Sequence, residues 1–107
     1  MAKQFNDQNF EKEVIESSKE KPVLVDFYAD WCGPCKMQGP IVDKLSEEME
    51  NKAIIGKLNV DEAQETASKY EVMSIPTLII FKDGEAKETL TGMRDQDSLK
   101  ESLEKYF

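Results

Sequence analysis

The only two cysteines of the chain, Cys32 and Cys35, are separated by two residues. An apolar run over residues 22–29 leads into them, and a helical pattern that starts near Pro34 follows. Two thiols three positions apart at the start of a helix lie on one face, about one turn apart. They can therefore form a disulfide and open it again, which indicates thiol–disulfide exchange.

The local sequence predicts different roles for the two thiols. A thiol reacts as its thiolate, and its pKa falls at a helix N-terminus, where unpaired N–H groups and the helix dipole favour negative charge. Cys32 precedes the expected helix, so we predict that it is the exposed nucleophile. Cys35 lies one turn inside, so we predict that it is the buried resolving thiol. Gly33 allows a tight turn between them, and Pro34 suits the first helical turn because no N–H is needed there.

A static disulfide and a zinc site are the alternative interpretations of the cysteine pair. Residues 1–5 contain no charged region followed by an apolar stretch, so we expect no signal peptide and a cytoplasmic protein. Thiols are kept reduced in that compartment, which disfavours a static disulfide. A zinc knuckle needs four ligands, and two cysteines without any histidine do not supply them, so we expect no metal site.

Composition narrows the function classes further. The chain has 107 residues, a formal net charge of −8 and no histidine. This length fits one domain, residues 1–107, with a single core. The negative charge argues against nucleic acid and anionic membranes as partners, and the short apolar runs could not span a membrane. Without histidine, neither a Ser-His-Asp triad nor a Cys-His pair is available.

Strand and helix patterns alternate along the chain. Residues 23–28 are apolar on both faces except for Asp26, which suits a central strand covered on both sides. The dipeptide Asp83–Gly84 predicts a hairpin between the last two strands. The expected strands are residues 2–5, 23–28, 53–60, 77–81 and 86–91. The order βαβαβαββα predicts an α/β fold in which a mixed five-stranded sheet is flanked by four helices.

Each of the four expected helices has an apolar face. Pro40 lies inside the second helix and should kink it. Asp61 is expected to cap the third helix, and Asp95 or Asp97 the fourth. The residues expected to face inward are Phe10, Val14 and Ile15 in the first helix, Met37, Ile41, Val42, Leu45 and Met49 in the second, Ala63, Ala67 and Tyr70 in the third, and Leu99, Leu103 and Phe107 in the fourth.

Several short motifs carry a resemblance to a known family. They are Asp26, residues 31–36 (Trp-Cys-Gly-Pro-Cys-Lys), Pro40, residues 56–61 with Lys57, residues 75–77 (Ile-Pro-Thr), residues 81–84 (Phe-Lys-Asp-Gly) and Gly92. With these motifs in this order, the chain resembles the thioredoxin family over essentially its whole length. The resemblance implies the thioredoxin fold and a general protein dithiol–disulfide oxidoreductase, which reduces target disulfides through a mixed disulfide.

Asp26 is a carboxylate within an apolar strand, where desolvation should raise its pKa. From the sequence, a catalytic acid and a buried structural pair with a lysine are equally open interpretations. The resemblance implies that Asp26 lies beneath Cys35 and relays its proton through water. It also implies that Lys57, on a neighbouring strand, pairs with Asp26.

Pro76 could simply mark the first residue of a strand, and Trp31 could be a core residue. The resemblance implies instead a cis peptide bond at Ile75–Pro76 beside the cysteines, with the Ile75 backbone pairing with an extended substrate segment. Trp31, Ile75, Pro76 and Gly92 would then form a flat apolar rim. Residues 93–94 (Met-Arg) occupy positions where small or apolar residues are common in the family, which bears on partner preference.

The resemblance also implies partners. No cofactor is bound, and electrons come from NADPH through a flavoprotein thioredoxin reductase, or through a ferredoxin-linked one in some relatives. The other partners are disulfide-containing target proteins, and we expect a monomer. One alternative is a disulfide-forming oxidase or isomerase, which Gly33–Pro34 disfavours because those relatives commonly carry histidine there. The other is a redox-independent binding subunit or regulator of a larger complex.

Overall fold

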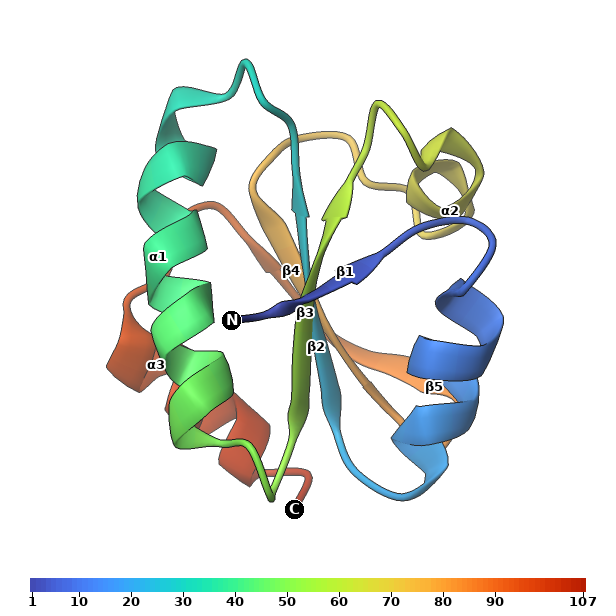
Figure 1. Cartoon of the computed structure of the whole chain (residues 1–107), viewed down its shortest axis with the longest axis vertical. Coiled ribbons are helices and arrows are strands. Elements are labelled where there is room, and N and C mark those ends of the chain that lie inside the picture. The colour runs from blue at the N-terminus through green and yellow to red at the C-terminus, as the bar shows by residue number, and fades with distance from the viewer.

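Five strands form one mixed sheet at the centre of the structure, a computed structural model that describes all of residues 1–107 (Figure 1). The strands are β1 (Lys3–Phe5), β2 (Val23–Tyr28), β3 (Ile54–Asn59), β4 (Thr77–Lys82) and β5 (Glu85–Thr91). Their spatial order is β1-β3-β2-β4-β5, in which β1, β3 and β2 are parallel and β4 is antiparallel to both of its neighbours. The predicted mixed five-stranded sheet is confirmed.

Helices cover both faces of the sheet (Figure 1). One face carries η1 (Glu11–Glu16), η2 (Ser17–Lys19) and α2 (Gln64–Lys69), and the other carries α1 (Gly33–Glu48) and α3 (Gln96–Glu104). The first helical segment is not a regular α-helix, because its turns are π-helical in η1 and tighten to 3-10 geometry in η2. None of the helices has the length and apolar character that crossing a membrane requires.

Strand β2 is buried along almost its whole length because both of its faces are covered. Val23, Val25 and Phe27 pack into the core beneath η1 and α2, whereas Leu24 packs into the core beneath α1 and α3. Side chains alternate between the two faces of a strand, so Asp26 points to the same side as Leu24. The alternation along β2 therefore directs a carboxylate toward α1, the helix that begins beside the cysteines.

Helix α1 contains Pro40 and packs on the sheet through a narrow stripe. The buried residues of this stripe are spaced by three or four positions: Cys35, Gln38, Val42 and Leu45. Met37 lies off the stripe and is 63% exposed, so the prediction that it faces inward is wrong.

Helix α3 begins as predicted. The Asp95 carboxylate accepts a hydrogen bond from the Ser98 N–H at 2.8 Å, and Leu99 and Leu103 are buried. Phe107, in contrast, is more than half exposed, so the prediction that it faces inward is wrong. The helix ends three residues before Phe107, so the helical period does not extend to it.

Gly56 in β3 lies so close to β1 that we expect it to tolerate no side chain. A Cβ at this position would meet the ring of Phe5 and, at 2.8 Å, the carbonyl oxygen of Lys3. Because the sheet holds both neighbours in position, Gly56→Ala should lower the free energy of unfolding by about 2–3 kcal/mol, measured by urea unfolding. Gly33→Ala is the matched control, since a Cβ there meets nothing within 4 Å. An equal loss in both variants would contradict the steric explanation.

Candidate active site

The chain passes from the carboxyl end of β2 through a short connection into α1 (Figure 1). The two cysteines lie at the start of this helix. Cys32 is the N-cap of α1, and its Sγ accepts a hydrogen bond from the Cys35 N–H at 3.2 Å. A disulfide joins the two residues, whose Cα atoms are 5.3 Å apart. Pro34 occupies the first turn, as predicted. The N–H groups and dipole at this helix end therefore favour negative charge on Cys32 Sγ once the disulfide is reduced.

The exposed fractions of the two cysteine residues do not distinguish them in the disulfide-bonded protein. Cys32 and Cys35 are each 5% exposed, so the prediction of an exposed Cys32 is wrong for the disulfide-bonded protein. Ile75 packs against the cysteines, and its carbonyl oxygen lies 3.8 Å from Cys32 Sγ. A disulfide sulfur carries no proton, so this contact is not a hydrogen bond in the oxidised protein. The two cysteines differ in their surroundings instead, because Cys35 lines a pocket together with Asp26 and Lys57, whereas Cys32 lies beside Ile75.

Trp31 lies at the surface next to the disulfide and is 70% exposed, which excludes a core position. Its indole Nε1 donates a hydrogen bond to the Asp61 carboxylate at 2.9 Å. The prediction that Asp61 caps the third helix is wrong, because α2 begins at Gln64, two residues later than such a cap requires, and has Ala63 as its N-cap. Asp61 orients Trp31 instead.

Ile75, Pro76 and Gly92 come together beside the disulfide. The Ile75–Pro76 peptide bond is cis, as the resemblance implied. The Gly92 N–H donates a hydrogen bond to the Pro76 carbonyl oxygen at 2.9 Å, which joins the end of β5 to the segment before β4. Neither the N–H nor the C=O of Ile75 has a backbone hydrogen-bond partner. The segment next to Cys32 therefore presents a backbone donor and acceptor that another chain could use.

Asp26 is fully buried, and neither of its carboxylate oxygens has a hydrogen-bond partner. It lines a pocket of about 450 Å³ together with Cys35, Lys57 and Asp43. Burial raises the pKa of Asp26 to about 7, while the positive charge of Lys57 lowers that pKa and the negative charge of Asp43 raises it. Asp26 therefore exchanges its proton near neutral pH, in the same pocket as the Cys35 sulfur.

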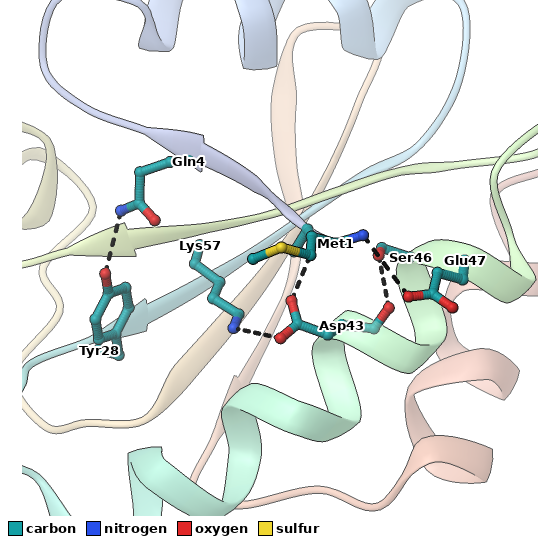
Figure 2. A network of polar contacts seen from close by, with 8 residues as sticks. Met1, Gln4, Tyr28, Asp43, Ser46, Glu47 and Lys57 are labelled. Carbon is teal, nitrogen blue, oxygen red and sulfur yellow. Dashed lines mark hydrogen bonds and ion pairs between the residues drawn. The ribbon is translucent and has the colours of Figure 1, made fainter.

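Lys57 does not pair with Asp26, contrary to the prediction. Its Nζ binds Asp43 Oδ2 at 3.1 Å, although Asp26 and Lys57 are register partners on β2 and β3 (Figure 2). Asp43 is partly exposed and also accepts a hydrogen bond from the Ala2 N–H at 3.0 Å, so its charge is less costly than one on buried Asp26. Burial raises the pKa of Asp43, but the hydrogen bonds from Ala2 and Lys57 outweigh it and hold that pKa below its ordinary value.

A family model described as thioredoxin matches residues 1–105. The chain belongs to the thioredoxin family. Thioredoxin of Rickettsia conorii is 48% identical over 105 residues, which are 98% of each chain. Thioredoxin of Bacillus subtilis is 50% identical over 101 residues, 94% of this chain and 93% of that one. The chloroplastic M-type thioredoxin of Spinacia oleracea is 46% identical over 102 residues, 95% of this chain and 55% of that one.

This thioredoxin is a dithiol–disulfide oxidoreductase, and its redox-active group is the Cys32–Cys35 disulfide. The predicted family, fold and activity are confirmed by these relatives. A bound cofactor is not typical of thioredoxins, so the two thiols themselves carry the electrons. Membership of the family implies a reductase and target proteins as partners.

Two polar residues of α1 are absent from the sequence prediction: Asp43, which lines the pocket, and Gln38, which is buried in the same helix. Cys35, Gly39 and Asp43 are spaced by four residues and line one pocket, and this helical spacing could have identified Asp43. The signal for Gln38 is its position as a polar residue within the buried stripe of α1. Both signals are weak in a sequence because they depend on which face of the helix is buried.

Proposed function

We propose that this thioredoxin is a general reductant of protein disulfides. The Cys32 thiolate attacks one sulfur of a target disulfide and forms a mixed disulfide, and the other target sulfur leaves as a thiolate that takes up a proton. The Cys35 thiol then loses its proton and attacks Cys32 Sγ, which releases the second target sulfur. Two electrons pass to the target, and the Cys32–Cys35 disulfide is formed.

The position of Cys32 at the N-cap of α1, where its Sγ accepts the Cys35 N–H, is the observation that carries this proposal. The same N–H can stabilise the Cys32 thiolate before the attack and after release of a target. Gly33 and Pro34 shape the turn that holds Cys32 at this helix end. The roles of nucleophile and resolving thiol thus follow from position relative to the helix and not from exposure.

Asp26 and Lys57 are assigned to the proton step. Asp26 lines the same pocket as Cys35, and a pKa of about 7 suits a group that accepts the Cys35 proton and later releases it. The pocket that both residues line, about 450 Å³, is large enough to admit water, which could carry the proton from one group to the other. Lys57 acts through its positive charge, which lowers the pKa of Asp26, and not through a direct pair.

The target is proposed to bind as an extended segment along a rim of four residues: Trp31, Ile75, Pro76 and Gly92. The unpaired N–H and C=O of Ile75 support this, because they can form hydrogen bonds with a peptide as an added strand does. Trp31 supports it because a large exposed aromatic side chain next to the nucleophile offers apolar contact area.

The reductase is proposed to be a flavoprotein that uses NADPH, and the site of action is proposed to be the cytoplasm. One thioredoxin domain, residues 1–107, acting as a monomer, suffices for this scheme, since one sheet and its helices supply every residue named. The net charge of −8 supports protein targets over nucleic acid.

A coupled assay tests the proposed function. NADPH oxidation is followed in the presence of a bacterial thioredoxin reductase, with insulin as the protein disulfide. The wild-type protein should reduce insulin, and the double variant Cys32→Ser, Cys35→Ser should not, because serine hydroxyls form no disulfides. Circular dichroism confirms that the double variant is folded. Insulin reduction by the folded double variant would refute the proposal, whereas a redox-independent binding role would survive both substitutions.

A further inference from the structure

Gln38 is a fully buried polar residue in the stripe of α1 that otherwise packs into the core. Its Nε2 donates a hydrogen bond to the Arg94 carbonyl oxygen at 3.0 Å, and its Oε1 accepts one from the Arg94 N–H at 2.8 Å. The side-chain amide therefore pairs with the backbone of one residue, as a neighbouring strand would. A buried amide without partners costs several kcal/mol, so glutamine is favoured here only while Arg94 keeps this position.

Arg94 ends the short segment Gly92–Arg94, which leads from β5 to Asp95, the N-cap of α3. At the other end of this segment, the Gly92 N–H binds the Pro76 carbonyl oxygen at 2.9 Å. Met93, between the two attachments, is 40% exposed and forms no backbone hydrogen bond. Pro76 and Gln38 therefore hold the segment from two sides, and Gln38 is its attachment to the helix that carries the cysteines.

We propose that Gln38 is a positioning residue that holds Gly92–Arg94 in place at the rim along which protein targets bind. This rests on the proposed function, because Gly92 is one of the four residues of the proposed rim. Without Gln38, the N–H and C=O of Arg94 would turn to water, and the segment would lose its attachment to α1.

Gln38 should affect the binding of protein targets but take no part in the reactions of the two thiols. Its amide is engaged by Arg94, and it has no hydrogen bond to either cysteine. A small disulfide needs only access to Cys32, whereas an extended polypeptide must also lie along the rim formed by Trp31, Ile75, Pro76 and Gly92. Loss of this attachment should therefore weaken binding of a protein disulfide and leave the reaction with a small disulfide unchanged.

The substitution Gln38→Met tests the inference, because methionine has a similar length and volume but cannot pair with Arg94. With wild-type protein as reference, KM for insulin should rise about fivefold to tenfold, as expected for the loss of one to two hydrogen bonds, while kcat stays within about twofold. The rate with cystine, a small disulfide, should also stay within about twofold. Amide hydrogen exchange at Arg94 should accelerate while exchange at Leu45, in the core of α1, does not.

Two further variants make the test decisive. Gln96→Met is the matched control, since the Gln96 amide binds only Glu48 at the surface, and it should change neither KM nor kcat. Gln38→Asn keeps an amide that is too short to reach Arg94 and should reproduce the rise in KM if the methionine variant is poorly folded. An unchanged KM for insulin in a folded Gln38 variant, or a parallel loss with cystine, overturns the role of Gln38. Failure of the wild-type protein to reduce insulin overturns the proposed function instead.

Discussion

Cys35→Ser is expected to trap target proteins as covalent mixed disulfides with Cys32, whereas Cys32→Ser should trap almost none. In the Cys35→Ser variant the first attack still takes place, but no second thiol is present to open the new bond. In the wild-type protein the resolving thiol belongs to the same molecule, and well-oriented intramolecular reactions reach effective concentrations of about 10⁵ M or more. Turnover in either variant should therefore fall by about a thousandfold or more.

Mixed disulfides are counted by non-reducing electrophoresis and mass spectrometry after each variant is reduced and mixed with insulin. The double variant Cys32→Ser, Cys35→Ser is the control for non-specific association and should yield no covalent adduct. Equal trapping by both single variants would refute the assignment of roles. This outcome is a real alternative, because the two cysteine residues are equally buried in the disulfide-bonded protein, and their roles are assigned from their positions at the start of α1.

The sheet could be predicted because its signals are local. Val23–Tyr28 is apolar on both faces and is the central strand, bordered by β3 and β4. Asp83 and Gly84 both have positive φ, as the tight turn between β4 and β5 requires, and the dipeptide Asp-Gly predicts such a turn. Handedness and short connections then leave few ways to arrange five strands and four helices, so local patterns determine most of the architecture.

The side-chain contacts of the site could not be predicted in the same way. Lys57 contacts Asp43 rather than Asp26, because the choice depends on the separation between α1 and the sheet and on residual hydration of each carboxylate. Cys32 is covered by Ile75, which is 43 residues away along the chain. A motif shows which residues take part in a site, but burial and pairing arise from segments that the fold brings together.

Asp26→Ala is expected to stabilise the protein by about 2–4 kcal/mol at about pH 8. The Asp26 carboxylate is fully buried without a hydrogen-bond partner, and burial raises its pKa from 3.8 to about 7. That displacement corresponds to a penalty of roughly 4 kcal/mol when the group is ionised in the folded protein. Alanine removes this penalty but also removes a few packing contacts of the side chain. The cost of losing these contacts is small, because water from the adjoining pocket can fill the space.

The stability that Asp26→Ala gains over the wild-type protein should increase as the pH rises. Asp26 binds its proton more tightly in the folded state than in the unfolded state, so its contribution is most favourable below about pH 3.8 and is lost as the pH rises to about 7. The Asp26→Ala variant lacks this titration. The difference in free energy of unfolding, measured in urea at a series of pH values, should therefore be small near pH 4 and largest at about pH 8.

The matched control Asp30→Ala distinguishes the effect of removing a buried carboxylate from the effect of removing any negative charge near the pocket. Asp30 lines the same pocket but is exposed, so Asp30→Ala should change the free energy of unfolding by no more than about 0.5 kcal/mol.

Asp43→Asn should lower the pKa of Asp26, because it removes a nearby negative charge and releases Lys57 to approach Asp26. The pH-dependent loss of stability should then begin and end at lower pH than in the wild-type protein.

The Asp26→Ala variant should also release mixed disulfides about tenfold to a hundredfold more slowly near pH 7, because Cys35 loses the adjacent group that accepts its proton. Single-turnover reduction of insulin, with the mixed disulfide quenched at intervals, measures this step apart from its formation. Asp30→Ala should release at the wild-type rate. A variant that is less stable than the wild-type protein and still releases its target at full rate would contradict both expectations. Asp26 would then be a structural carboxylate whose raised pKa has no part in the exchange.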